Sequence, residues 1–163
     1  MKQSGRISER IFLSGPLQSQ LQWWRLINKT VVFTNGVFDI LHEGHIKVLS
    51  QAASMADILI VGINSDASVK RLKGNERPVN REQSRALILA SLIMIDAVII
   101  FEEDTPLNLI KSIMPDVLVK GGDYSLETVV GANEVIANGG KVEIIALEEG
   151  FSTTGIIEKL RKL

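Results

Sequence analysis

The sequence contains no cysteine and only two histidines, and both shortages narrow the chemistry open to it. Without cysteine, the chain has no disulfide framework, no thiolate zinc site and no cysteine nucleophile. Any chemistry that needs an imidazole must use His42, His45 or both. Aromatic residues make up only 5% of the chain, so we expect a core built from aliphatic side chains.

The sequence also lacks a long apolar run and an excess of charge of one sign. The first ten residues are polar, and the apolar stretches 86–95 and 97–101 are too short to span a bilayer. With 18 basic and 19 acidic residues, the net charge of −1 argues against a surface dedicated to nucleic acid or anionic lipid. We therefore expect a soluble, cytoplasmic protein that binds neither nucleic acid nor a membrane.

After residue 29 the chain alternates short apolar runs with helical patterns, and its 163 residues suffice for one domain with a full core. Five strands are expected, at residues 30–34, 57–63, 96–101, 116–120 and 141–146. Helical patterns follow them at residues 44–54, 81–93, 105–113, 127–138 and 153–162. Strands separated by helices predict a Rossmann-like, doubly wound α/β domain with a five-stranded parallel sheet.

Residues 1–29 precede this alternation and are expected to form an N-terminal helical extension to the main domain, residues 30–163. Within the extension, Leu17–Ile27 has the spacing of an amphipathic helix and carries both tryptophans of the chain. Two placements are open for this helix. It packs either on the edge of the domain or against another subunit.

Polar clusters follow four of the five expected strands. They are Thr34–Asp39 running into His42–His45, then Asn64–Asp66, Lys120–Tyr124 and Gly150–Thr154. Ligands of an open parallel sheet bind beyond the carboxyl ends of its strands, so we expect these clusters to form one site. The motifs G-x-G-x-x-G and G-x-x-x-x-G-K-[ST] are absent, which disfavours hydride transfer and a P-loop NTPase.

His42 and His45 are three residues apart at the start of an expected helix, which places both rings on one face. Unpaired N–H groups and the helix dipole attract anions there, and Gly44 lets a ligand approach the backbone. We interpret the pair as a polyphosphate site, and two surface or capping histidines are the alternative. Zinc is disfavoured, because the spacing is not H-E-x-x-H and Asp39 is the one further local ligand, so no metal ligand is assigned.

Two further features indicate phosphate binding. Six of the 18 basic residues lie within positions 70–85, namely Lys70, Arg71, Lys73, Arg77, Arg81 and Arg85. No aromatic residue is interleaved among them, so a phosphate clamp explains the cluster better than nucleic-acid stacking, with a solvated face as the alternative. Ser152–Thr154 begin the last expected helix, as a second phosphate-binding N-terminus or as an ordinary cap.

Together these motifs resemble the signatures of the cytidylyltransferase-like nucleotidyltransferases. Thr34–His45 (TNGVFDILHEGH) resembles the first signature, Glu82-x-x-Arg85 the middle one and Ser152–Thr154 the last. The resemblance spans residues 30–160 and implies that 30–163 is a nucleotidyltransferase domain. Within this family, the pattern is most similar to that of the adenylyltransferases that form ADP-heptose for lipopolysaccharide. The segments that carry this similarity are Asn64–Asp66, Arg71–Gly74, Arg77–Val79, Phe101–Pro106, Val119–Tyr124 and Gly150–Thr154.

Two alternatives stay open beside this resemblance. The glycerol-3-phosphate cytidylyltransferases are similar, but they carry Arg where this chain has Leu147 and Trp where it has Tyr124. The other alternative is a nucleotide-binding module without turnover. In many bacteria the ADP-heptose-forming domain is fused to a sugar kinase, so this chain resembles a stand-alone form or an excised domain, with the heptose kinase on a separate chain. A homodimer or higher homo-oligomer is also implied.

The resemblance implies transfer of AMP from ATP to heptose 1-phosphate, with Mg²⁺ carried mainly by the ATP phosphates. The attacking phosphate is anionic near neutral pH, so the protein must align the reactants and offset charge. It implies that His42 and His45 hold the triphosphate, Lys73 bridges the α-phosphate and the incoming phosphate, and Arg85 steadies the phosphates. The implied nucleotide-binding residues are Thr34, Asn35, Gly36, Val37, Phe38, Asp39, Gly44, Gly122, Asp123, Ser152, Thr153 and Thr154.

Overall fold

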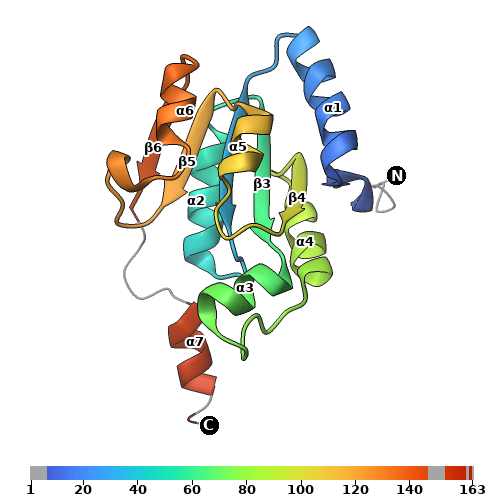
Figure 1. Ribbon diagram of the computed structural model, residues 1–163. Helices are drawn as coiled ribbons and strands as arrows, with labels where there is room; N and C mark the ends of the chain where they lie inside the picture. Colours follow the sequence, from blue (N-terminus) through green and yellow to red (C-terminus); the bar gives the residue numbers. More distant parts are fainter. Residues whose placement is uncertain (1–6, 147–152, 161, 163) are drawn as a thin grey trace.

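The computed structural model describes residues 7–146, 153–160 and 162, and a parallel sheet lies at its centre (Figure 1). The six strands run in the order β1-β4-β3-β2-β5-β6. They are β1 (Ile11–Phe12), β2 (Val31–Gly36), β3 (Ile58–Asn64), β4 (Ala97–Phe101), β5 (Val117–Gly121) and β6 (Lys141–Ile145). The helices are α1 (Ser14–Leu26), α2 (Glu43–Ala53), α3 (Asp66–Lys73), α4 (Glu82–Ala90), α5 (Leu107–Ile113), α6 (Ala132–Ala137) and α7 (Thr153–Leu160).

Helices cover both faces of this sheet, which confirms the predicted doubly wound α/β fold. One face packs against α2 and α4, and the other packs against α1, α5 and α6. All seven residues of β3 are buried, as the continuous apolar run of a central parallel strand predicts. No helix among residues 7–146 and 153–160 combines the length and the apolar character needed to cross a membrane.

The sheet has six strands where five were expected, because Ile11 and Phe12 add the edge strand β1. These two residues pair in parallel with Val98 and Ile99 of β4. A run of two residues is too short to show the alternation from which strands are predicted. The N-terminal segment therefore contributes to the same sheet as the rest of the chain.

Helix α1 packs on the domain, with Leu17 and Leu21 buried among the apolar side chains of the second face. Trp24 contacts Phe12 edge-on, with ring centroids 6.5 Å apart. Arg25 donates a hydrogen bond of 2.9 Å to the carbonyl oxygen of Ile113 at the end of α5. Of the two placements open for this helix, the edge of the domain is the one that these contacts support.

Two helices differ from the sequence-based expectation. Helix α3 was not expected. Ser65 caps its N-terminus, because the Ser65 hydroxyl oxygen accepts a hydrogen bond of 3.1 Å from the N–H of Ser68. The helix expected at 127–138 is divided into a 3₁₀ turn at Leu126–Thr128 and helix α6. It is interrupted at Gly131, whose φ of +85° favours glycine, and a Cβ there would lie 2.7 Å from Ile110.

The strand order reverses between β2 and β5, which makes their carboxyl ends the switch point of the sheet. From β2 the order runs through β3 to β4 on one side, whereas β5 and β6 lie on the other. Thr34 of β2 is paired with Val119 of β5, so Asn35 and Lys120 lie at the reversal. Because parallel α/β sheets bind ligands at such a reversal, the topology places a site there.

Candidate active site

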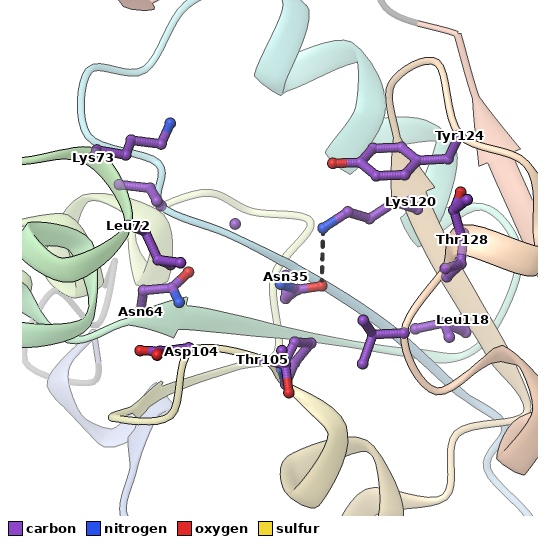
Figure 2. Close-up of a pocket in the computed structure, with 15 residues that line it drawn as sticks. Asn35, Asn64, Leu72, Lys73, Asp104, Thr105, Leu118, Lys120, Tyr124 and Thr128 are labelled. Carbon is purple, nitrogen blue, oxygen red and sulfur yellow. Dashed lines mark hydrogen bonds between the residues drawn. The ribbon is translucent and has the colours of Figure 1, made fainter.

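Two cavities lie beside the segment that ends β2, at the switch point. The small cavity, of about 180 Å³, includes Phe38, His45 and Val48 in its wall. The large cavity, of about 360 Å³, includes Asn64 and Lys73 (Figure 2). The residues that line both cavities are Asn35, Gly36, Val37, Lys120 and Tyr124. The two cavities therefore share a wall formed by the ends of β2 and β5 and by their loops.

The two histidines lie together at the start of α2. His42 is the N-cap residue, and its ring stacks on that of His45 with centroids 3.8 Å apart and 29° between the planes. The ring of Phe38 also contacts His45, at 5.2 Å between centroids. The first turn of this helix therefore presents two imidazoles on one face, and His45 faces the small cavity.

Burial lowers the pKa of both imidazoles. The pKa of His45 falls to about 4, because its ring is buried and the charges of His42 and Lys73 are near. Burial likewise lowers the pKa of His42. His45 is therefore neutral near pH 7 and has one N–H to donate, and among the described residues its buried Nδ1 has no hydrogen-bond partner. A buried polar atom of this kind suits a ligand that supplies the missing bond.

Two lysines point toward the large cavity from opposite sides (Figure 2). Lys73 ends α3, and burial together with the charge of Arg77 lowers its pKa. Lys120 lies near the end of β5, where its Nζ donates a hydrogen bond of 3.3 Å to Oδ1 of Asn35 and lies 5.4 Å from the centroid of the Tyr124 ring. Burial lowers the pKa of Lys120 as well. Within the part of the chain that the structure describes, neither lysine forms an ion pair with a carboxylate.

Arg85 is 1% exposed, and protein atoms occupy most of its hydrogen-bonding capacity. Its Nε donates to the carbonyl oxygen of Asn80, and Nη1 donates to that of Val37. Its Nη2 donates to the carbonyl oxygen of Asn64 and to Oδ1 of Asp66, both at 2.8 Å. Four of the five guanidinium N–H groups are thus used within the protein. Arg85 therefore ties three separate segments together, and its expected contact with the phosphates stays a prediction.

Asp39 is buried and holds the segment that follows Lys73. Its carboxylate accepts hydrogen bonds from Nε of Arg77 at 2.8 Å and from the N–H groups of Val79 and Asn80 at 2.9 and 2.8 Å. Burial alone would raise the pKa of Asp39, but the hydrogen bonds from Asn80, Val79 and Arg77 lower it below its ordinary value. Asp39 therefore fixes the position of the basic segment, and its expected contact with the nucleotide stays a prediction.

The remaining expected residues of β2 and α2 lie around the small cavity. Its wall includes Thr34, Asn35, Gly36, Val37 and Phe38. Gly44 is buried in the first turn of α2. These positions agree with the predicted convergence of residues 34–45 on one edge of the sheet.

The expected residues from later loops are more dispersed. The N–H of Gly122 donates to the carbonyl oxygen of Ile145, and Asp123 lines neither cavity. The Thr153 hydroxyl donates to the carbonyl oxygen of Ile40 at 3.4 Å, which places the start of α7 beside the loop before α2. Thr154 lines a third cavity, of about 260 Å³, together with Lys73. Ser152 lies outside the described residues.

Sequence reasoning did not assign a role to Lys120, which the fold places at the centre of the site. The available signal is that the apolar run 117–119 ends in a lysine followed by two glycines. A cation at the carboxyl end of a buried strand lies at the edge where α/β sheets bind ligands.

A parallel α/β sheet with cavities and unpaired cations at its switch point defines a domain that binds phosphate-bearing ligands. Residues 33–159 match the Cytidylyltransferase-like family. The chain belongs to this family of nucleotidyltransferases, and the family that the motifs predicted is confirmed.

Curated relatives resemble almost the whole of this chain. The bifunctional protein HldE of Nitrobacter winogradskyi is 58% identical over 146 residues, which are 90% of this chain and 30% of that protein. The bifunctional protein HldE of Geobacter sulfurreducens is 58% identical over 134 residues, 82% of this chain and 27% of that protein. The chain thus spans about 30% of the length of the curated relatives that it matches.

Two solved structures share the fold. The lipopolysaccharide core biosynthesis protein from Thermoplasma volcanium superposes with a TM-score of 0.59 at 28% identity, over 74% of this chain and 97% of that one. A pantoate-beta-alanine ligase from Francisella tularensis superposes with a TM-score of 0.55, over 90% of this chain and 76% of that one. At 15% identity, the ligase supports the fold alone.

Proposed function

We propose that this chain is an adenylyltransferase that moves AMP from ATP to D-glycero-D-manno-heptose 1-phosphate, giving ADP-heptose and pyrophosphate for lipopolysaccharide core biosynthesis. The observation that carries this proposal is the set of motifs shared with ADP-heptose-forming adenylyltransferases, whose described parts surround one site. The 58% identity to bifunctional HldE proteins and the likeness to a lipopolysaccharide core biosynthesis protein support it.

In the proposed reaction, a phosphate oxygen of the acceptor attacks the α-phosphorus of ATP in line with the departing pyrophosphate. One P–O bond forms, and the bond from the α-phosphorus to the bridging oxygen breaks, with its electron pair leaving on pyrophosphate. The attacking phosphate is already anionic near neutral pH, so no general base is needed. Catalysis then consists of alignment and of stabilising the charge that develops.

The side chains of the site suit this task. The neutral rings of His42 and His45 donate N–H groups to the triphosphate and stabilise the leaving pyrophosphate. Lys73 bridges the α-phosphate and the incoming phosphate. The start of α7, at Thr153, supplies a second helix N-terminus for the β- and γ-phosphates. Arg85 holds the surrounding loops in register.

When bound, Mg²⁺ neutralises part of the triphosphate charge. No group of three or more histidine, aspartate or glutamate side chains that could hold a metal gathers among the described residues. We propose that the ion is held mainly by the ATP phosphates, because phosphates offer the hard oxygen ligands that Mg²⁺ prefers. A heptose kinase on a separate chain, a homo-oligomeric state and a cytoplasmic location stay predictions.

The test is a pair of incubations with detection of pyrophosphate and of the nucleotide sugar. With ATP, Mg²⁺ and heptose 1-phosphate, we expect ADP-heptose and one pyrophosphate per product. Faster turnover with CTP and glycerol 3-phosphate would instead assign the chain to the cytidylyltransferase alternative. Binding of ATP without pyrophosphate release in either incubation would support the non-catalytic module.

A further inference from the structure

The wall shared by the two cavities limits which groups can touch both reactants. In the proposed reaction the acceptor phosphate must reach the α-phosphorus, so a nucleotide in one cavity and an acceptor in the other would meet at this wall. Lys120 carries the one charged side chain among the residues that line both cavities. Its ammonium group is therefore placed where two anionic phosphates come together.

The surroundings of Lys120 leave its charge available to a ligand. Of its three N–H donors, one is used by Oδ1 of Asn35, at 3.3 Å. The face of the Tyr124 ring lies 5.4 Å away, and no carboxylate among the described residues pairs with the ammonium. A partly buried cation without a counter-charge is costly, and a bound phosphate would remove that cost.

The large cavity has the size and the lining for the rest of the acceptor. Its volume of about 360 Å³ lies in the range of small-molecule sites, roughly 300–1,000 Å³. Asn64 and Thr105 carry an amide and a hydroxyl on its wall, which can hydrogen-bond to sugar hydroxyls. One N–H of the Asn64 amide is already donated to Ser68, and the Thr128 hydroxyl on the same wall is already bonded to Ser125. Figure 2 shows Lys73 and Lys120 on opposite sides of this space, so that an acceptor phosphate between them has a cation on each side.

We propose that Lys120 is a catalytic residue that binds the phosphate of the acceptor, and that the large cavity holds the acceptor's sugar. This assignment rests on the proposed function, since it requires a sugar phosphate as the second substrate. The nucleotide triphosphate occupies the other side of the shared wall, where His45 lies. Removing Lys120 should therefore affect the acceptor far more than the nucleotide.

The experiment measures binding without turnover. The full chain is saturated with a non-hydrolysable ATP analogue and Mg²⁺, then titrated calorimetrically with heptose 1-phosphate and, separately, with inorganic phosphate. Loss of a charge-assisted hydrogen bond should make Lys120→Met bind heptose 1-phosphate about 10- to 100-fold more weakly. The affinity for the ATP analogue should change by less than about threefold, and Lys120→Arg should recover part of the acceptor affinity.

Lys141→Met is the matched control, because it removes an exposed lysine from the opposite end of the neighbouring strand β6. The Lys141→Met variant should leave the affinities for the ATP analogue and for heptose 1-phosphate unchanged. Thermal unfolding measurements show whether each variant is folded. Unchanged phosphate binding in folded Lys120→Met, or a loss confined to the ATP analogue, overturns the assignment.

The same titrations separate this assignment from the proposed function. If the wild-type chain binds inorganic phosphate through Lys120 but does not bind heptose 1-phosphate, the proposed function fails and the phosphate site stands. If the wild-type chain binds neither probe, the assignment of Lys120 fails as well.

Discussion

The two edges of the sheet use charge in opposite ways. At the amino edge, Asp57, Asp96 and Asp116 each precede a strand and accept hydrogen bonds from backbone N–H groups of a neighbouring strand. At the carboxyl edge, among the described residues, Lys73 and Lys120 have no carboxylate partner. The aspartates bond to the backbone of the fold and so contribute to its stability. The two lysines lack such a partner, which makes them candidates for binding an anionic ligand.

The aspartates of the amino edge extend the hydrogen-bond ladder by one bond each. Oδ2 of Asp116 accepts from the N–H of Val31 at 2.7 Å, and Oδ2 of Asp96 accepts from that of Leu59 at 2.8 Å. The corresponding bond from the N–H of Thr30 to Asp57 measures 3.0 Å. These N–H groups lie within one residue of the start of a strand, ahead of the regular pairing with the strand that supplies the aspartate.

The largest effects on turnover are expected from substitutions of His45 and Lys73. His45→Ala and Lys73→Ala should each reduce the rate of ADP-heptose formation on the order of 10²–10³-fold, because each removes a donor to developing charge. The melting temperature should stay close to that of the wild type, since neither side chain is tied to another in the fold by an ion pair. Pyrophosphate release measures the rate, and near-normal turnover by either variant would remove that residue from the mechanism.

Arg85 sharpens the comparison, because it is a buried cation of the carboxyl edge that the fold itself pairs, through hydrogen bonds to three carbonyl groups and to Asp66. Arg85→Met should lower the free energy of unfolding by about 3 kcal/mol, since it leaves buried acceptors without donors. Urea denaturation measures this change. Loss of activity at unchanged stability would instead indicate a direct contact with the phosphates.

Asp116 offers the matched test at the amino edge. Asp116→Ala should lower the free energy of unfolding by about 1–2 kcal/mol through loss of the bond from the N–H of Val31, with turnover of the folded protein unchanged. Urea denaturation and steady-state kinetics on the same preparation check the two statements. A fall in turnover without a fall in stability would contradict the purely structural role assigned to the aspartates of the amino edge.

The smallest effect is the pH dependence of stability that His45 contributes. Its pKa of about 4 lies below the ordinary 6.5, so the unfolded chain binds more protons between these values and stability falls as the pH falls through that window. His45→Gln removes this term, so its loss of stability from pH 7 to pH 5 should be about 1 kcal/mol smaller than that of the wild type.

Asp57 provides a separate window for the same measurement. Its hydrogen bonds with Thr30 and Lys29 lower its pKa to about 2, from an ordinary 3.8. The stabilisation from this lowered pKa is present above pH 3.8 and is lost as the pH falls toward 2. Urea denaturation between pH 7 and pH 5 therefore excludes Asp57 and reports both histidines, and the difference between the wild type and His45→Gln isolates His45. Equal pH dependence in the two proteins would contradict the assigned burial.

Most elements and their order could be predicted from the sequence, because periodicity reflects burial within each element. The short strand β1 and helix α3 could not. The clusters at 34–45, 64–66 and 120–124 could also be placed together, since strand polarity alone brings them to one edge. The partners of Arg85 could not, because its acceptors at Val37, Asn64 and Asn80 come from three separate segments. Lys120 was missed for a similar reason, since its importance arises from the reversal of strand order between β2 and β5.

The short strand β1 has a consequence for how this protein behaves at high concentration. It pairs with Val98 and Ile99, so it covers backbone N–H and C=O groups on the outer edge of β4. An uncovered apolar edge of this kind is a template on which strands of other molecules can add. Ile11 and Phe12 thus cover a stretch of apolar strand edge that would otherwise be open to a strand of a second molecule.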